Sequence, residues 1–384
     1  MSCSSPLDSS CLSPLPTDLP VIAVYDFDST IFSQDVDSVA LEMHEELIGP
    51  LSQKNYPVWT DYMSACLANL HTAGVTPEAL QQRLRNYPLN PGMAATIRAF
   101  AAAGVPQFIL SDANTLLISA VLAIHGLKRF FPDAHVLTNH AVVDRETGLI
   151  TLHYHHRNVW SSRSPKNMCK GVGILSLWSR IASGALPVPA PRAAAPSEDR
   201  DTEPFDMRAP RAFAPGTSLI DAAKFAGYQG HTAYFGDGGN DFLPCAQLGP
   251  RDWVCARRGY VLEEWIDHGL GRAPSPYQRT EEEIAAGAPE WPRGTCAAVA
   301  ARVMRWGSYT DSTGAELRAI VEEVVRETRS GAAVWWDGLA PVGLSAATAT
   351  VVPAVAEAVA QAELAATAID ANIAEAHPAA KAQV

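Results

Sequence analysis

The chain has 384 residues, of which 47% are hydrophobic and 18% charged, and its formal net charge is -12 at pH 7. This length and composition predict a globular protein with a large core and room for a second unit. The acidic balance argues against a nucleic-acid or anionic-membrane surface, although it does not exclude a local basic pocket. We therefore expect neither nucleic acid nor a membrane as a partner.

The seven cysteines are odd in number and show no paired spacing, which is typical of a reducing compartment. The first twenty residues lack a basic start followed by an apolar core, and no run of about 18 apolar residues occurs in the chain. We expect free thiols, a cytoplasmic location and a disordered lead over residues 1–20.

An apolar stretch, Val21–Tyr25, follows this lead. Its short β-branched run predicts a strand buried on both faces of a parallel sheet. Asp26 and Asp28 come directly after it, and open α/β sheets bind ligands at the carboxyl ends of their strands. A carboxylate there can attack phosphorus, and a second one can move the proton of the leaving group. The alternative is an Asp/Ser/Thr turn that caps the following helix.

Residues 33–90 carry helical periodicity in three stretches, at 36–47, 59–70 and 76–88. The third stretch has the signature of a helix start, because Thr76 can serve as N-cap with proline at the first helical position. We expect a small helical cap inserted after the first strand. Its methionines and aromatic residues favour packing over cofactor binding.

A second strand is predicted at Val105–Leu110, after a helix that starts near Asn90. It ends at Ser111, whose hydroxyl can donate to a phosphate oxygen while the N-terminus of a helix near Asn114 adds its positive end. The alternative for Ser111 is an ordinary helix cap. Residues 134–156 predict a β-hairpin that decorates the core.

Three histidines, His153, His155 and His156, together with Cys169, raise the question of a zinc site. No C-x-x-C or H-x-x-x-H spacing supports zinc, so solvent-facing strand histidines are favoured. Lys170 lies near the start of the next predicted helix and could hold a phosphate. Its alternative is a solvated surface charge.

Residues 184–216 are rich in Pro, Ala, Arg and acids and predict a disordered insert within one domain. A further strand at Thr232–Phe235 then ends in a glycine-rich loop with Asp237 and Asp241. Glycines let the backbone turn sharply where a ligand approaches, and two carboxylates four residues apart suit a hard cation. A bare turn would explain the glycines but not the acids.

The remaining pattern predicts one more strand and four helices, followed by an Ala-rich tail without an assigned function. The strand is expected at Asp252–Ala256, and the helices at 218–226, from 257 through Trp265, near 295–306 and at 315–328.

Taken in chain order, the strand ends at Asp26, Ser111 and Asp237, with Lys170 between the last two, resemble the four signature motifs of the haloacid dehalogenase superfamily. Six stretches resemble more closely the phosphoethanolamine/phosphocholine and pyridoxal phosphate phosphatase family. They read YDFDSTI, NYPLNPGM, FILSDAN, NMCK, YFGDGGND and RRGY. The resemblance covers about residues 21–306.

The fold implied by this resemblance is α/β, with a Rossmann-like parallel sheet and the small helical cap inserted after the first strand. The core would comprise residues 21–32 and 91–308, interrupted by the disordered insert at 184–216. The cap would comprise residues 33–90, and residues 309–384 would form a helical, Ala-rich C-terminal extension.

The resemblance also implies a mechanism. Asp26 would attack phosphorus to give an aspartyl-phosphate, while Asp28 would protonate the leaving alkoxide and later activate water. Mg²⁺ would be held by Asp26, the backbone carbonyl of Asp28 and Asp237, with Asp241 as a ligand or just outside the ligand shell. The helical cap would shield the site from bulk water.

Phosphate and substrate contacts follow from the same resemblance. Ser111 and Lys170 would hold the non-bridging phosphate oxygens. Asp37 and Asp112 match the acids that hold a small cationic head in the phosphocholine-type enzymes, and Asn114 is a further candidate for substrate binding. The alternative is that Asp37 and Asp112 only cap their helices.

We therefore expect a Mg²⁺-dependent phosphomonoester phosphatase acting on a small phosphorylated metabolite, with phosphoethanolamine and phosphocholine as the leading candidates. Pyridoxal phosphate is the main rival, because Trp59 or Tyr62 could wall its ring. A phosphomutase or phosphotransferase of the same fold would keep every motif. A dehalogenase has no need of the second acid, Asp28, and a non-catalytic binding protein would have no need of Asp26, Lys170 and Asp237 together. The sequence does not predict the oligomeric state.

Overall fold

The computed structural model describes residues 21–158, 164–186, 206–208, 230–268, 299, 301–307 and 314–329. Several stretches for which the sequence makes predictions lie outside these residues: the lead 1–20, most of the insert 184–216, the helix 218–226 and the tail beyond 329.

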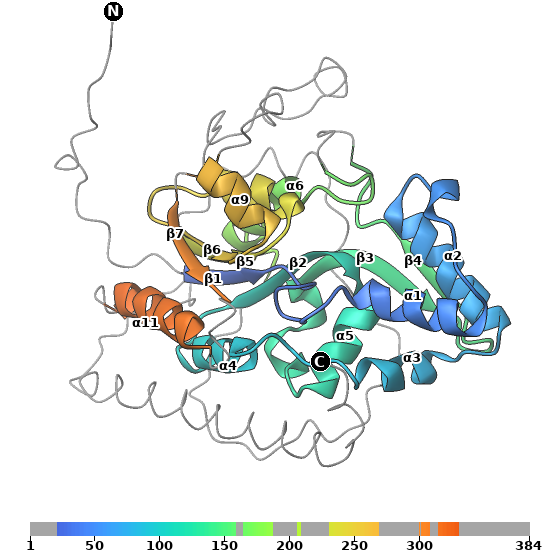
Figure 1. Cartoon of the computed structure of the whole chain (residues 1–384). Coiled ribbons are helices and arrows are strands. Elements are labelled where there is room, and N and C mark those ends of the chain that lie inside the picture. Colours follow the sequence, from blue (N-terminus) through green and yellow to red (C-terminus); the bar gives the residue numbers. More distant parts are fainter. Residues whose placement is uncertain are drawn as a thin grey trace, which may run out of the picture.

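A seven-stranded sheet forms the centre of the molecule, in the order β4-β3-β2-β1-β5-β6-β7 (Figure 1). Every pairing is parallel except that of β3 with β4, so the predicted Rossmann-like α/β fold is confirmed. The strands are β1 (Val21–Tyr25), β2 (Gln107–Asn114), β3 (Val136–Val143), β4 (Ile150–His153), β5 (His231–Gly236), β6 (Trp253–Arg257) and β7 (Arg302–Trp306).

Helices cover both faces of the sheet. They are α1 (Val36–Leu47), α2 (Trp59–Thr72), α3 (Pro77–Leu84), α4 (Met93–Ala102), α5 (Thr115–Ile124), α6 (Lys170–Ala182), α8 (Phe242–Gln247), α9 (Val261–His268) and α11 (Ala315–Arg329). Because successive side chains of a strand point to opposite faces, β1 supplies two hydrophobic clusters. Ala23 and Tyr25 join the cluster that contains α4, α5 and α11, and Val24 joins the cluster that contains α6 and α8.

The central strand β1 is buried along its whole length. It pairs with β2 on one side and β5 on the other. The ladder continues one residue beyond the strand, because the amide of Asp26 donates to the carbonyl of Phe235 at 2.8 Å. The central position of β1 thus fixes the backbone that carries the first two acids.

Three helices, α1 to α3, follow β1 and lie together beside β4 (Figure 1). The start of α3 is as predicted, since Thr76 caps it by accepting a hydrogen bond from the amide of Ala79, and Pro77 is its first residue. The helix α2 packs against α1 and β4. Buried residues of all three helices belong to the same hydrophobic cluster as β1, so this region packs continuously with the sheet.

The hairpin predicted at 134–156 exists, but its description as a decoration is wrong. The first strand, β3, pairs in parallel with β2 and is an inner strand of the sheet; only β4 is added antiparallel at the edge. The sequence pattern around the turn predicts a hairpin, but it does not show that the first half of β3 is buried. This buried half joins the hairpin to the sheet. In addition, β2 extends to Asn114, four residues beyond its predicted end.

The helix predicted near 295–306 is also wrong for its described part. Arg302–Trp306 is the edge strand β7, which pairs in parallel with β6. Arg302 and Arg305 are three residues apart, a spacing that resembles one face of a helix, but here they lie on an edge strand. The guanidinium of Arg302 lies 3.9 Å from the ring centre of Trp253. Residues 295–298 lie outside the described part of the chain.

The predicted last helix is present as α11, and it belongs to the core rather than to an extension that starts at 309. Its apolar face is buried in the same cluster as β1, through Leu317, Ile320, Val321, Val324 and Val325. The sequence boundary fails because this face finds its partner, α4, more than 200 residues earlier in the chain.

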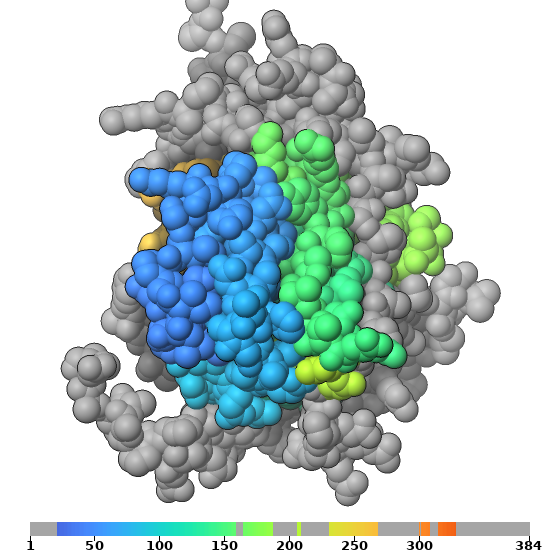
Figure 2. All heavy atoms as spheres, turned by 90° about the vertical axis from the view of Figure 1, so that its right-hand side faces the viewer, coloured from blue at the N-terminus to red at the C-terminus, as the bar shows by residue number. Residues whose placement is uncertain are grey.

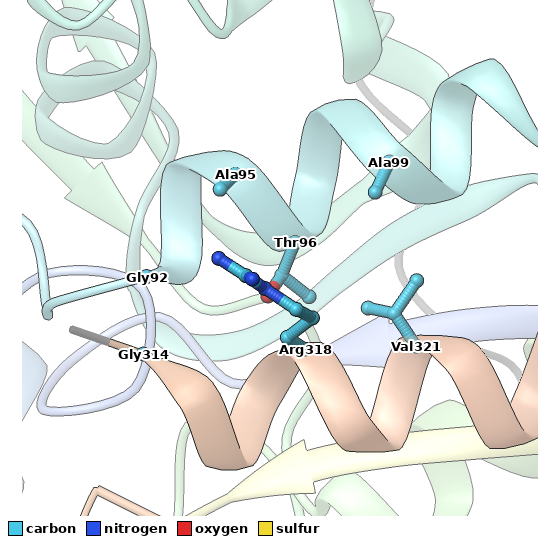
Figure 3. Close-up of a pocket in the computed structure, with 7 residues that line it drawn as sticks. All are labelled: Gly92, Ala95, Thr96, Ala99, Gly314, Arg318 and Val321. Atoms are coloured by element: carbon cyan, nitrogen blue, oxygen red, sulfur yellow. The ribbon is translucent and has the colours of Figure 1, made fainter. Parts of the chain in front are cut away.

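Two glycines permit the contact of α11 with α4. Gly92 and Gly314 both have positive φ angles, and a Cβ on either would lie 2.5 to 2.6 Å from the Cα of the other. Figure 3 shows Arg318 and Val321 of α11 facing α4 across a cavity of about 10 Å³ next to this crossing. Only glycine at both positions allows so close an approach.

Part of the predicted disordered insert packs on the molecule. Leu186 and Met207 are buried, and Met207 belongs to the hydrophobic cluster of α1 to α3. Arg208 bonds to Glu78 of α3 at 3.0 Å and to the carbonyl of Arg145 in the hairpin turn at 3.2 Å. Figure 2 shows residues 206–208 (yellow-green) between these two segments. Single apolar residues in a polar segment give no periodic signal, which is why the sequence did not predict this contact.

Four cysteines, Cys66, Cys169, Cys245 and Cys255, are buried free thiols, as predicted for this part of the chain. Among the helices that the structure describes, none combines the length and the apolar character needed to cross a lipid bilayer.

Candidate active site

The end of β1 carries a buried acid in contact with a buried base. Asp26 is 5% exposed, and its Oδ1 accepts a hydrogen bond from the amide of Phe27 at 2.7 Å. Its Oδ2 lies 2.7 Å from Nζ of Lys170, the first residue of α6. Burial raises the pKa of Asp26 well above its ordinary value and Asp241 raises it further, against the opposing charge of Lys170. This carboxylate is held in one orientation, with a cation beside it.

The alternative of a solvated surface lysine is wrong, because Lys170 is 1% exposed. Its Nζ also donates to Oδ1 of Asp241 at 2.8 Å. Burial lowers the pKa of Lys170, but the carboxylates of Asp241 and Asp26 outweigh this effect and raise the pKa above its usual value. The side chain is therefore a permanent positive charge at the end of the sheet.

Both oxygens of Asp241 are fully engaged. Oδ1 accepts from Lys170 and from the hydroxyl of Tyr234 at 2.8 Å, and Oδ2 accepts from the amides of Asp237 and Gly238 at 3.0 and 2.9 Å. A Cβ on Gly236 would lie 2.6 Å from Oδ2, so glycine is required there. Asp241 holds the loop and the lysine, and it has little capacity left for a metal ion.

Asp237 follows β5 and faces the same space. Its Oδ1 accepts from the hydroxyl of Thr30 at 2.9 Å. Burial, with Asp241 nearby, raises its pKa to about 7. Asp26, Asp237 and Asp241 can each place a carboxylate oxygen within 4.8 Å of the others, which fits a hard divalent cation. Because Asp241 is engaged, Asp26 and Asp237 are the better ligands.

Asp28 is half-buried, and its Oδ1 accepts a hydrogen bond from the amide of Val36 at 2.7 Å. This bond ties the second acid to the first turn of α1. Burial raises the pKa of Asp28 well above its ordinary value, and the nearby Asp35 and Asp37 raise it further. A raised pKa favours the protonated form of an acid, which can donate its proton.

A cavity of about 320 Å³ opens beside these acids. Its lining comprises Asp26, Asp28, Ser29, Asp35, Asp37, Trp59, Asp112, Ala113, Asp237, Gly238 and Asn240. Six of these residues are aspartates, and none of the lining residues carries a positive charge. The cavity is therefore strongly acidic, with a single large aromatic wall.

Asp37 and Asp112, the two proposed acids for a cationic head, both lie in this lining. The alternative that they only cap helices is wrong, because Asp35 caps α1 and Asn114 caps α5. Asp37 accepts from the indole of Trp59 at 2.9 Å and from the amide of Asn114 at 3.2 Å. Asp112 accepts from Asn240 at 3.1 Å.

Asn114 is 1% exposed and is not part of the lining, so it reaches the cavity only through Asp37. Ser111 is fully buried within β2, where its Oγ accepts from the amide of Ala113 at 3.2 Å. The alternative of a helix cap is therefore wrong for Ser111 as well. Ser111 and Asn114 each bond to a residue of the lining, Ala113 and Asp37 respectively, but neither belongs to the lining itself.

Comparisons with known proteins agree with this geometry. A family described as "Putative Phosphatase" matches residues 21–183. Inorganic pyrophosphatase 2 of Arabidopsis thaliana is 36% identical over 157 residues, which cover 40% of this chain and 55% of that protein. Pyridoxal phosphate phosphatase PHOSPHO2 of Bos taurus is 25% identical over 254 residues, which cover 65% of this chain and 86% of that protein. The chain is thus similar to proteins described as phosphatases over the part that carries Asp26, Asp28, Ser111 and Lys170.

The chain thus spans about half the length of the plant relative and most of the length of PHOSPHO2. Among solved structures, phosphoserine phosphatase in its apo form is similar with a TM-score of 0.36 and 14% identity, over 64% of this chain and 90% of that one.

Other residues of this candidate site were not predicted from the sequence. Asp35 and Asn240 line the cavity, and Asn90 and Arg257 bond to the loop after Asp28. Asp35 could have been found from the Asp-x-Asp spacing with Asp37. Asn90 and Arg257 lie in recognised stretches, but nothing in the sequence shows that they meet.

The zinc alternative finds no support in the described part of the chain, where only Asp26, Asp237 and Asp241 could hold a metal together. The expectation of solvent-facing histidines is confirmed for His153 but is wrong for His155 and His156, which are buried. His156 accepts from the amide of Cys169 at 2.8 Å. Burial lowers the pKa of His155 to about 3 and that of His156 to about 4.

Proposed function

We propose that this chain is a Mg²⁺-dependent phosphomonoester phosphatase that works through an aspartyl-phosphate at Asp26. The observation that carries the proposal is the placement of Asp26 and Asp28 in one cavity wall, with Lys170 bonded to Asp26 from behind. A nucleophile, a proton carrier and a fixed cation are the groups that phosphoryl transfer to a carboxylate needs.

In the first step, a carboxylate oxygen of Asp26 forms a bond to phosphorus while the bond from phosphorus to the ester oxygen breaks. Asp28 gives its proton to that departing oxygen, a role that its raised pKa favours. In the second step, the Asp28 carboxylate takes a proton from water, and the water oxygen forms a bond to phosphorus while the bond from phosphorus to the Asp26 oxygen breaks; phosphate leaves and the Asp26 carboxylate is restored. Lys170 stays charged throughout and balances the negative charge of the reacting groups.

Asp26 and Asp237, with the backbone carbonyl of Asp28, would hold Mg²⁺, since their oxygen atoms suit a hard cation. The bound ion would offset the negative charge of these carboxylates and of the phosphoryl oxygens. Ser111 would act with Lys170 on the phosphate side of the site. Asp241 would keep Lys170 and the Asp237 loop in place.

The acidic cavity supports a substrate whose leaving group is cationic. Asp35, Asp37 and Asp112 surround the space beyond Asp28, and the face of Trp59 can attract an ammonium group. Phosphoethanolamine and phosphocholine carry such a group, and so they are the leading candidates. Asp37 and Asp112 would then bind the head of the substrate, with Asn114 orienting Asp37.

Two relatives suggest other substrates. PHOSPHO2 is named a pyridoxal phosphate phosphatase, and Trp59 lines the cavity where its ring would lie, whereas Tyr62 is not part of the lining. The plant relative is named an inorganic pyrophosphatase. Pyrophosphate would place a second anionic phosphate among the acids, which like-charge repulsion disfavours.

The test is phosphate release from a panel of phosphate compounds with Mg²⁺ present. The panel comprises phosphoethanolamine, phosphocholine, pyridoxal phosphate and pyrophosphate. We expect the cationic monoesters to have the highest kcat/KM. Absence of phosphate release from every compound would overturn the proposal, and transfer of the phosphate to a second substrate would show a mutase or phosphotransferase instead.

A further inference from the structure

The loop that follows Asp28 has an unusual backbone. Ser29 has a φ angle of 52°, and no other non-glycine residue in the described ranges has a positive φ. Serine rarely adopts this left-handed region, so neighbouring groups must hold it there. Ser29 also lines the cavity next to Asp28. Its conformation therefore determines where the proton-carrying acid lies.

Two side chains converge on the carbonyl oxygen of Ser29. Nδ2 of Asn90 donates to it at 2.9 Å, and it also contacts the carbonyls of Thr30 at 2.9 Å and Phe32 at 3.1 Å. Nη1 of Arg257 donates to the same Ser29 oxygen. The two donors come from positions 61 and 228 residues away in the chain.

The arginine is itself well fixed. It is the last residue of β6, and its guanidinium lies 4.3 Å from the ring centre of Tyr260 and 5.6 Å from that of Trp306. A Cβ on Gly307 would lie 3.3 Å from Cγ of Arg257, so glycine leaves room for the side chain. Planar guanidinium groups stack on aromatic rings in a way that a lysine cannot reproduce.

We propose that Asn90 and Arg257 are positioning residues that hold the Ser29 carbonyl and thereby aim Asp28 at the leaving oxygen. Neither residue lines the cavity, so neither needs to touch the substrate. The inference rests on the proposed function, because it assigns these residues to the proton transfer of the first step. It also gives a functional role to one residue in each of the stretches NYPLNPGM and RRGY.

The proposal predicts a dependence on the leaving group. An alkoxide needs the proton of Asp28 as its bond to phosphorus breaks, whereas p-nitrophenolate is stable enough to leave without one. Misplacement of Asp28 should therefore slow alkyl substrates far more than p-nitrophenyl phosphate. A general loss of structure would slow both substrates alike.

The experiment measures kcat/KM, which reports the steps up to departure of the leaving group, for phosphoethanolamine and p-nitrophenyl phosphate with Mg²⁺. For Arg257→Gln we expect a loss of about 10²-fold with the alkyl substrate and less than about threefold with the aryl substrate. Arg257→Lys keeps one donor without the stacking, and so its alkyl loss should be about tenfold.

The matched control is Arg258→Gln. Arg258 is the neighbouring arginine, but it pairs with Glu316 of α11 at 3.0 Å and is partly exposed. Its substitution should change both substrates by the same factor. Thermal melting shows whether each variant is folded. If Arg257→Gln is not folded, the comparison of the two substrates is made with Arg257→Lys.

Equal losses with both substrates in the folded Arg257 variants would overturn the inference while leaving the proposed function intact. A parent protein that hydrolyses neither substrate would instead overturn the proposed function, and this inference with it. A larger loss with phosphoethanolamine, partly recovered in Arg257→Lys, is the predicted result.

Discussion

The carboxylates at the cavity differ in whether they have a cationic partner. At the phosphate end, the carboxylates of Asp26 and Asp241 are both bonded to the buried cation of Lys170. Elsewhere in the lining, Asp37 receives hydrogen bonds only from neutral donors, the indole of Trp59 and the amide of Asn114, and Asp112 receives one from the amide of Asn240. Lys170 thus compensates the charge of Asp26 and Asp241. We propose that a cationic substrate compensates the charge of Asp37 and Asp112.

This difference explains why the two ends should have different tasks. A fixed cation suits the phosphoryl group, which every phosphomonoester shares. Uncompensated buried carboxylates are costly, and burial raises the pKa of Asp37 to about 8. A cationic leaving group would offset that cost when it binds. The buried carboxylates would therefore favour a cationic substrate over a neutral one.

The largest expected effect comes from removing the nucleophile at the phosphate end. Asp26→Asn keeps nearly the same volume but replaces the attacking oxygen by an amide. We expect turnover to fall by on the order of 10⁴-fold or more, as for other covalent nucleophiles. Steady-state phosphate release and thermal melting are the measurements. A folded variant that retains a tenth of the parent activity would exclude attack by Asp26.

A smaller loss should follow from Asp28→Asn, because this acid moves protons but makes no covalent bond. General acid-base help is worth about 10²- to 10⁴-fold, so kcat should fall within that range. Since the variant also lacks the base for the second step, acid-quenched protein should retain labelled phosphate. Complete absence of labelled protein under every condition would favour direct attack by water.

Substitution at the acidic end should change selectivity rather than chemistry. In Asp37→Asn we expect the ratio of kcat/KM for phosphocholine over pyridoxal phosphate, measured above pH 8 where Asp37 is ionised, to fall about tenfold, since one charge contact to the ammonium group is lost. Asp61→Asn is the matched control, because Asp61 also lies on the cap but bonds to Tyr154 outside the cavity. If the ratio does not change in Asp37→Asn, Asp37 is structural and the cationic-head assignment fails.

The smallest expected effect is a pH dependence of stability from the same substitution. A carboxyl group whose pKa rises from 3.8 to about 8 on folding binds its proton more tightly in the folded state. Its contribution to stability is therefore present below the unfolded pKa and is lost as the pH rises through about 8. The Tm of Asp37→Asn minus that of the parent should increase between pH 5 and pH 9. A difference that is constant over this range would contradict the raised pKa.

The sequence predicted well the features that depend on local order. The apolar run of β1 followed by Asp26 and Asp28 predicts a strand end with acids, and the cap at Thr76 predicts the start of α3. What it missed depends on contacts between distant residues. The burial of Lys170 follows from its bond to Asp241, 71 residues later, and the hold on Ser29 follows from Arg257. The strand β7 is stabilised by its pairing with β6, whereas its own residues resemble a helix face.

The central claim is that the uncompensated end of the cavity selects a positive charge. The most direct test compares phosphocholine with 3,3-dimethylbutyl phosphate, in which a carbon replaces the quaternary nitrogen at nearly the same size and shape. We predict that kcat/KM of the parent protein is at least about tenfold higher for phosphocholine, a preference of about 1.4 kcal/mol for the charge itself. Equal values for the two substrates, or a preference for the neutral one, would contradict the account.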